Sequence, residues 1–371
     1  MNSFRLALAT MVITTSACNA VAQTATVYGI IDLGITRASG SLTSATKLNS
    51  SESTGSRLGF KAEEDMGNGF KARVVLEGSI APDSGVGLSS NTNNQASGSA
   101  VASAGSQGFT FNRQSIVGLS GPFGELRLGR DYTPTFLAVA LYDPFGSNSS
   151  FVMPQNFQGS ITGIALPNGA RSSNAIGYST PSAIGSVTEG FQGRFMYGLG
   201  ENASNAGATA NDGDYLGAAF HMQRGPIDVG VAFAKYWLAA MGDIRETVIV
   251  GTLRLGDGKL YAQYLQDDTG SANSMRGHLL GGSYVAGAVE WKATWSRSDT
   301  ESRAGLKIGT SNKYAVGVAY SLSKRTALYA NAALVSNSNG ARGVPFPGIG
   351  ASSTAPNEDT RAYGIGVRHS F

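Results

Sequence analysis

The residues that could take part in catalysis are few and widely separated. The chain has three histidines, His221, His278 and His369, and none of them has a nucleophile motif beside it. Nucleophilic catalysis needs a hydroxyl, a thiol or a water molecule that is activated by a positioned base. The sequence also lacks the spacings of phosphate-binding loops, zinc sites and calcium-binding loops. We therefore expect no enzymatic activity, no cofactor and no metal site.

Charged side chains instead alternate with apolar ones in short segments. Residues 57–61 and 70–78 show this pattern on either side of a tight connection. Their charged positions are, in chain order, Arg57, Lys61, Lys71, Arg73 and Glu77. Because successive side chains of a strand point to opposite faces, these segments are predicted to form a β-hairpin with one charged and one apolar face.

The composition favours strands over helices. Hydrophobic residues make up 42% of the chain and charged residues only 14%, against roughly 25% charged in a typical soluble domain. Glycine contributes 50 of the 371 residues, about twice its ordinary share, which argues against long helices and for many turns and closely approaching strands. The net charge of +3 is too small to suggest nucleic acid as a partner.

The N-terminus has the features of a secretory signal peptide. A short positively charged start is followed by an apolar run at residues 6–13 and by small residues at 20–22. We predict a signal peptide at residues 1–22 and a mature domain at residues 23–371. The single cysteine, Cys18, lies in the signal, so the mature chain has no disulfide and no thiolate metal site. A lipoprotein signal acylated at Cys18 is disfavoured, because Thr15 stands where such signals carry leucine.

Beyond the signal, no apolar stretch approaches the ~20 residues of a transmembrane helix. The longest mid-chain apolar run, residues 136–142, has seven. A mature chain of this kind that spans a membrane must do so as a closed β-barrel. We count sixteen predicted strands, seven short turns and eight longer loops, with both ends of the chain on the short-turn side. A soluble β-sandwich has no reason to keep its short turns at one end, whereas an even-numbered membrane barrel does so throughout.

The longer loops and the final strand complete this prediction. The loops include residues 38–56, 131–170 and 299–311. Within the second of these, the apolar run 136–142 is predicted to be a short helix that anchors the loop. The final strand ends the chain, and its apolar side is predicted to face lipid; that side carries Tyr363, Ile365, Val367, His369 and Phe371.

Several segments together resemble the trimeric porins of Gram-negative bacteria, in particular the branch found in Neisseria, Bordetella and Burkholderia. These segments are VYGIIDLGI, SRLGFKAEEDMGNGFKARVVLE, FNRQSIVGLSGPFGELRLGRDYTP, RSSNAIGYSTP and YGIGVRHSF, and they span the mature chain. The resemblance implies an all-β fold: a 16-stranded antiparallel transmembrane β-barrel with short periplasmic turns and long outer loops. It also implies a homotrimer and an inward-folded third loop at residues 131–170.

The same resemblance implies a pore constriction between this loop and a basic wall. The residues that match the family's constriction are Arg57, Arg113, Arg130 and Arg171 on the wall, with Asp131 and Asp143 as the opposing acids. Alternation alone adds Lys61, Arg73 and Arg127 as possible pore-lining residues. The two acids are fewer than some family members carry near the tip of this loop.

We therefore predict an outer-membrane porin that forms a water-filled channel for small hydrophilic solutes and ions. Because arginines outnumber the loop acids, we expect a weak preference for anions. A substrate-specific outer-membrane channel is the first alternative, and a secreted or surface β-rich adhesin is the second. The expected partners are outer-membrane lipid and the barrel assembly machinery, for which Tyr363 and Phe371 would form the assembly signal.

Overall fold

The computed structural model of the protein describes residues 24–95, 108–146, 169–181, 190–239, 242–269, 273–345 and 349–371. The predicted signal peptide lies outside these residues. Within them, no helix is long and apolar enough to cross a membrane.

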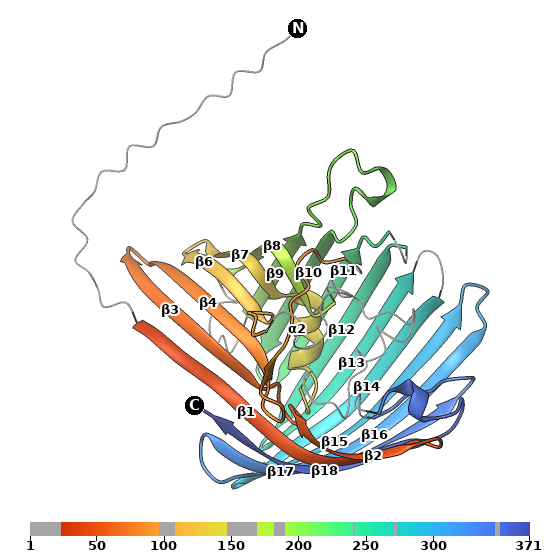
Figure 1. The fold of residues 1–371 in the computed structure, drawn as a ribbon. Helices are drawn as coiled ribbons and strands as arrows, with labels where there is room; N and C mark the ends of the chain where they lie inside the picture. Colours follow the sequence, from red (N-terminus) through yellow and green to blue (C-terminus); the bar gives the residue numbers. More distant parts are fainter. Residues whose placement is uncertain are drawn as a thin grey trace.

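One closed antiparallel sheet forms the wall of the molecule (Figure 1). Its strands are β1 (Thr24–Ser39), β3 (Arg57–Gly67), β4 (Phe70–Ala81), β6 (Gln114–Gly121), β7 (Gly124–Tyr132), β8 (Arg171–Ser179), β9 (Gly190–Gly198), β10 (Tyr215–Arg224), β11 (Ile227–Tyr236), β12 (Ile244–Leu255), β13 (Gly258–Thr269), β14 (Asn273–Ala286), β15 (Val289–Ser302), β16 (Lys307–Ser321), β17 (Thr326–Ser338) and β18 (Thr360–Ser370). Each strand pairs with its neighbour along the chain, and β18 pairs with β1. The predicted 16-stranded barrel is confirmed.

The seam between β1 and β18 is fixed at the very end of the chain. β1 and β18 pair over ten residues, from Ile30 opposite Ser370 to Ser39 opposite Arg361. Beyond this ladder, the backbone of Phe371 exchanges two hydrogen bonds with Gly29, at 3.1 and 3.2 Å. A β-carbon at position 29 would collide with the Phe371 ring, so glycine is required there for space.

Two strands pair with the edge of β1 that β18 leaves free. The first half of β1 pairs with β3, and its second half pairs with β2 (Ser44–Ser50). Residues 51–56 connect β2 to β3, and two of their backbone amides donate to one carboxylate oxygen of Asp32, at 3.0 and 2.6 Å. The prediction of a loop at residues 38–56 is therefore wrong where β2 lies. Polar side chains occupy both faces of this strand, with Ser44, Thr46 and Ser50 on one and Lys47 and Asn49 on the other, and they conceal its alternation.

A second predicted loop is also mostly strand. β15 ends at Ser302 and β16 begins at Lys307, so the loop predicted at residues 299–311 is a four-residue connection. Three further short elements are β5 (Val86–Gly87), which pairs only with β4, and the 3₁₀ turns η3 (Gly207–Thr209) and η4 (Ala351–Ser353).

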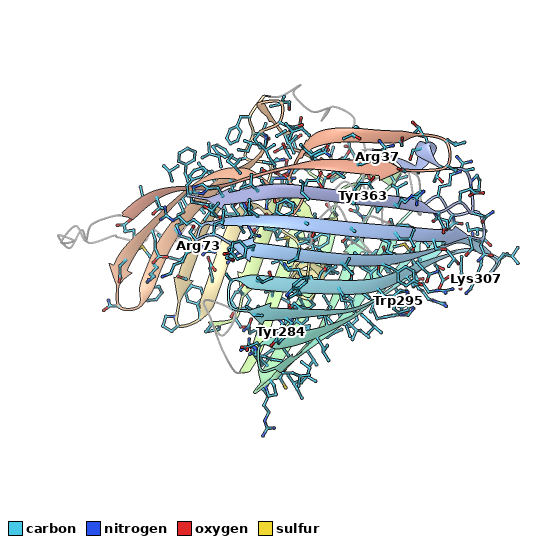
Figure 2. All side chains as sticks on the ribbon, turned by 90° about the horizontal axis from the view of Figure 1, so that it is seen from below. Arg37, Arg73, Tyr284, Trp295, Lys307 and Tyr363 are labelled. Carbon is cyan, nitrogen blue, oxygen red and sulfur yellow. The ribbon has the colours of Figure 1, made fainter. Side chains whose placement is uncertain are left out.

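The two faces of the wall differ as alternation predicts. In β18 the exposed fractions of Tyr363, Ile365 and Val367 are 54, 65 and 42%. Aromatic side chains lie toward both rims of the wall. Figure 2 shows Tyr284 close to the ends with short turns and Trp295 toward the opposite ends. An apolar outer band with aromatic residues at both edges is the surface of a membrane barrel.

The helix α2 (Pro134–Leu141) lies inside the barrel (Figure 1). Proline at the first position favours a helix start, and the Thr133 hydroxyl accepts a hydrogen bond from the amide of Phe136 at 3.4 Å. The apolar side chains of the helix pack on inward-facing residues of β10 to β14: Ala219, Ala232, Val248, Val250, Leu265 and Met275. The prediction that residues 136–142 anchor the loop as a short helix is confirmed.

Candidate functional site

Three of the predicted basic residues meet on the inner wall. Arg57 begins β3, Arg113 immediately precedes β6 and Arg171 begins β8. We call these three residues the arginine cluster. The Nε of Arg113 donates to Oε1 of Glu77 in β4 at 2.6 Å, and Nη1 of Arg57 lies 3.9 Å from the same oxygen. The Glu77 carboxylate thus forms ion pairs with two guanidinium groups.

Tyr132, at the end of β7, joins the arginine cluster to the interior helix. The guanidinium carbon of Arg171 lies 4.7 Å from the centre of the Tyr132 ring, and that of Arg113 lies 5.8 Å from it. These are favourable cation–π distances. The same ring stacks on Phe136 of α2, with centroids 5.4 Å apart. The position of α2 and the positions of the arginines are therefore coupled through one aromatic ring.

A second charged group, the turn-side cluster, lies nearer the short turns. The Nε of Arg73 is 2.5 Å from Oε1 of Glu125, and Nη2 of Arg127 is 2.8 Å from Oε2 of the same carboxylate. Nη1 of Arg127 pairs with Asp131 at 3.0 Å, and Arg194 of β9 is close enough to interact with these charges. Asp131, predicted as an acid that opposes the basic wall, is in fact part of that wall.

Two predicted basic residues, Arg130 and Lys61, lie outside both clusters. Arg130 connects the segment between β5 and β6 to β8, because its Nη1 donates to the carbonyl of Asn91 at 2.9 Å and to the hydroxyl of Ser173 at 2.6 Å. The ammonium group of Lys61 lies 5.7 Å from the ring centre of Tyr28. The contacts of Arg130 are those of a residue that holds a loop in place.

Asp143 follows α2 and lies on the opposite side of the interior. Its Oδ1 accepts a hydrogen bond from the amide of Phe145 at 2.8 Å. Burial raises the pKa of this carboxyl to about 7, although Lys292 and Lys313 lower it in part. Asp143 therefore faces basic residues of β15 and β16 and not the arginine cluster. Residues 147–168 of the predicted constriction loop lie outside the described residues.

The second half of α2 is held by hydrogen bonds to the wall. The hydroxyl of Tyr142 donates to Oδ1 of Asp228 at 2.6 Å and lies 3.0 Å from Nδ1 of His221. The side-chain amide of Gln263 donates to the carbonyl of Val139 at 3.1 Å. His221, considered in the sequence as a catalytic candidate, therefore has a contact that positions the helix.

The wall beneath α2 buries two carboxyl groups that the sequence did not point to. Glu246 and Asp267 are directly opposite each other on β12 and β13, with exposed fractions of 2 and 1%. The Tyr236 hydroxyl donates to Glu246 at 2.6 Å and lies 3.4 Å from the hydroxyl of Thr135 in α2. After Glu246, the next two inward-facing residues of β12 are apolar, Val248 and Val250. Apolar residues on the face that would otherwise meet water were the one feature of the sequence that could have indicated a segment packed against this wall.

Sequence reasoning also missed the acids that pair with the arginines. Glu77 lies on the charged face predicted for its hairpin, and Glu125 and Tyr132 lie within the segment FNRQSIVGLSGPFGELRLGRDYTP. Neither the alternation nor the family resemblance assigns a role to any of the three. Among the residues that the structure describes, no group of three or more His, Cys, Asp or Glu side chains could hold a metal ion.

Comparison with known proteins gives one consistent result. The model of a family described as "Gram-negative porin" matches residues 7–340. Outer membrane porin protein 32 of Delftia acidovorans is 30% identical over 95% of each chain, and major outer membrane protein P.IB of Neisseria meningitidis serogroup B is 25% identical over 93% of this chain and 94% of its own. The solved structure of an anion-selective porin from Comamonas acidovorans superposes with a TM-score of 0.78 at 28% identity, and covers 94% of this chain and 100% of its own.

Proposed function

The chain belongs to the Gram-negative porin family, and we propose that its channel has a weak preference for anions, set by the arginines of the inner wall. The protein is an outer-membrane porin whose barrel forms a water-filled channel for the passive diffusion of small hydrophilic solutes and ions. Family and fold point to a channel and away from an enzyme.

The balance of charge on one side of the barrel supports this proposal. The arginine cluster carries three guanidinium groups against one carboxylate, Glu77. The turn-side cluster adds three guanidinium groups, from Arg73, Arg127 and Arg194, against two carboxylates. Together these give six positive and three negative groups along β3 to β9. Charges that line a pore bias the passage of ions by sign, and this excess favours anions.

The preference is expected to be weak because most of these charges are partly compensated. Arg113 and Arg127 are already paired with carboxylates at 2.6 to 3.0 Å. At physiological salt, charges further apart than ~8 Å are largely screened in water. A permeating anion therefore meets an attractive wall but no deep binding site, which suits diffusion better than the retention of one substrate.

The test is the reversal potential of single channels in a salt gradient. We expect anion preference in the wild type and a smaller preference in Arg57→Ala and Arg113→Ala. Arg276→Ala is the matched control, because Arg276 is a half-exposed residue of β14 on the outer face of the wall. Clear cation preference in the wild type would overturn the proposal, and unchanged selectivity in both lumen variants would remove these arginines from the constriction. Saturation of the current by one solute would favour the substrate-specific alternative.

We also propose that the barrel functions as a homotrimer. The trimer form of OmpT, an outer membrane protein of Vibrio cholerae, shares the fold at 15% identity. Within this chain, β6 and β7 have 8 and 9 residues, at or below the ~9–11 that a strand needs to cross a membrane. A neighbouring barrel would cover their exposed outer side chains, which include Val117, Leu119, Leu126 and Leu128. Chemical cross-linking in native membranes tests this, and a monomer under all conditions would overturn it.

The remaining proposed partners are membrane lipid and the assembly machinery. Tyr363 and Phe371, with exposed fractions of 54 and 45%, present aromatic rings on the outer face of the last strand. That position is accessible to a factor that receives the strand before the barrel closes. Deletion of Phe371 should lower the amount of folded barrel in the outer membrane without changing synthesis, and normal assembly would argue against this signal.

A further inference from the structure

The loop that enters the barrel continues past α2 and crosses the inner wall as far as β16. We call residues 143–146 the loop foot. Phe145, with an exposed fraction of 7%, packs on small and apolar inward-facing residues: Ala38, Leu279, Ala315, Ala333 and Ala362. Pro144 lies against Gly281 of β14. The foot is therefore seated on the side of the barrel opposite the arginine cluster.

Two glycines in the wall provide the space for this seat. A β-carbon at Gly281 would lie 2.8 Å from Cγ of Pro144 and equally close to Cγ2 of Thr294 in the wall. One at Gly317 would lie 2.7 Å from Cε1 of Phe145 and closer still to Oδ1 of Asn331, a wall side chain. Real β-carbons do not approach heavy atoms this closely, so any side chain there must displace something. Neither glycine has a positive φ. They are required for space and not for backbone conformation.

The neighbouring glycine, Gly282, provides an internal comparison. It follows Gly281 on the same strand and points outward, and the nearest heavy atom to a β-carbon there is 3.7 Å away. An alanine at 282 would fit without any shift. The tight contact is thus a property of the inward-facing glycine beneath the loop foot, and not of this part of β14.

The loop cannot yield by sliding along the wall. Its helix is held on one side by the hydrogen bonds of Tyr142 to Asp228 and of Val139 to Gln263. Behind the glycines stands a closed sheet, in which Gly281 pairs with Thr294 and Gly317 with Asn331. Overpacking forces neighbouring groups to move, and the direction left open is toward the water of the channel.

We propose that Gly281 and Gly317 set how far the loop foot extends into the channel, and so set the upper size of the solutes that pass. This inference rests on the proposed function, because it requires that the interior is an open pore. The two glycines are positioning residues: they act through Pro144 and Phe145 and do not contact the solute.

The experiment compares Gly281→Ala and Gly317→Ala with Gly282→Ala. Each variant is first checked for heat-modifiable migration on a gel, which reports a folded barrel. Single-channel conductance is then measured together with liposome swelling in sugars of increasing size. For the two inward variants we expect conductance to fall by roughly a third or more, as overpacking of a fixed seat would give. The uptake of larger sugars should fall more steeply than the uptake of small ones, and Gly282→Ala should match the wild type.

Two further measurements distinguish loop displacement from general distortion. The reversal potential should stay unchanged in the glycine variants, because no charge has been added or removed. Phe145→Ala should have the opposite effect and raise the uptake of larger sugars, because it removes the ring that packs between the loop foot and the wall. In the double variant Phe145→Ala with Gly317→Ala, the second substitution should not change the size limit further, because the Phe145 ring is gone and only Oδ1 of Asn331 is left to shift.

Several outcomes would overturn the inference. Wild-type conductance in both inward glycine variants would do so, as would an unchanged size limit in Phe145→Ala. If Gly317→Ala still lowers the size limit in the Phe145→Ala background, the cause is a collision with Asn331 in the sheet and not a displacement of the loop foot. A wild-type protein that forms no pores would instead contradict the proposed function, so the two failures can be told apart.

Discussion

The two sides of the channel interior are built on opposite principles. Along β3 to β9, long charged side chains project from the wall, and each carboxylate is shared between two guanidinium groups or binds one directly. Along β10 to β16, α2 and the loop foot pack on alanine, valine, leucine and methionine side chains as a helix packs on a hydrophobic core. The charged groups of this wall, such as Glu246 and Asp267, are buried beneath the loop. One side supplies the field that acts on ions, and the other side holds the loop that narrows the space. The first should control selectivity and the second should control size.

The largest effect on selectivity should come from reversing a charge in the arginine cluster. Arg113→Glu removes the partner of Glu77 and places a second carboxylate beside it. We expect the preference to change from anions to cations, with a shift of about tenfold in the permeability ratio, or ~1.4 kcal/mol. Conductance for small ions should change much less. Reversal potentials measure the ratio, and Arg276→Glu on the outer face is the control that should leave it unchanged.

Neutralising one acid on the same side should increase the preference for anions. Glu77→Gln keeps the shape of the side chain but removes the only carboxylate that Arg57 and Arg113 share. Two uncompensated guanidinium groups should raise the anion-to-cation permeability ratio, by about two- to threefold at an interior effective dielectric near that of a protein surface. A loss of anion preference in this variant would show that Glu77 positions Arg113 more than it neutralises it.

The loop foot, on the side opposite the arginine cluster, should respond to pH. Burial raises the pKa of Asp143 to about 7, well above the ~3.9 of an exposed aspartate. A folded-state pKa above the unfolded value means that the neutral form is favoured, so this group's contribution to stability is lost as the pH rises toward 7. Open-channel noise should therefore increase as the pH is raised from about 4 to about 7 and level off above 7, as the loop foot becomes less firmly held.

Asp143→Asn should remove this pH dependence while leaving the reversal potential at low pH as it was. Burial also raises the pKa of Glu52, between β2 and β3, to about 7. Glu52→Gln is therefore the necessary second variant. If the noise keeps its pH dependence in Asp143→Asn and loses it in Glu52→Gln, the effect belongs to the barrel seam and the prediction for the loop is wrong.

The smallest expected effect comes from one hydrogen bond of the helix. Tyr142→Phe removes the bond to Asp228 at 2.6 Å and the contact with His221, while the ring that packs on the wall is kept. The loss should be ~1 kcal/mol, which shortens the time that the loop stays seated without changing the mean conductance. Single-channel recordings should show more frequent brief closures or openings, and a large fall in conductance would mean that this hydroxyl does more than hold the helix.

The wall could be predicted from the sequence because each of its residues has one of two environments. Side chains such as Ile365 and Val367 meet lipid, their neighbours meet the interior, and alternation of that kind can be recognised one strand at a time. The prediction failed over residues 44–50, where β2 has polar side chains on both faces, serine and threonine on one and lysine and asparagine on the other. No local pattern distinguishes such a strand from a polar loop, and its pairing with β1 makes it a strand.

The site could be predicted less well, because its geometry depends on contacts between strands. The positions of Arg57, Arg113 and Arg171 followed from resemblance to a family. The pairing of Arg113 with Glu77 depends on how the segment before β6 lies against β4, and a single segment carries no information about that register. The location of Asp143 depends on where the loop crosses the barrel. A loop acid was expected to face the arginines, and the structure has it beside Lys292 and Lys313.

The seam between β1 and β18 has a consequence for how one barrel meets another. Phe371 lies on Gly29, and their backbones exchange two hydrogen bonds that extend the ten-pair ladder of these strands. An unpaired strand edge is a template on which another chain can add a strand. Because this edge of β1 is occupied as far as Gly29, two barrels can associate through their side chains but not by continuing one sheet into the other.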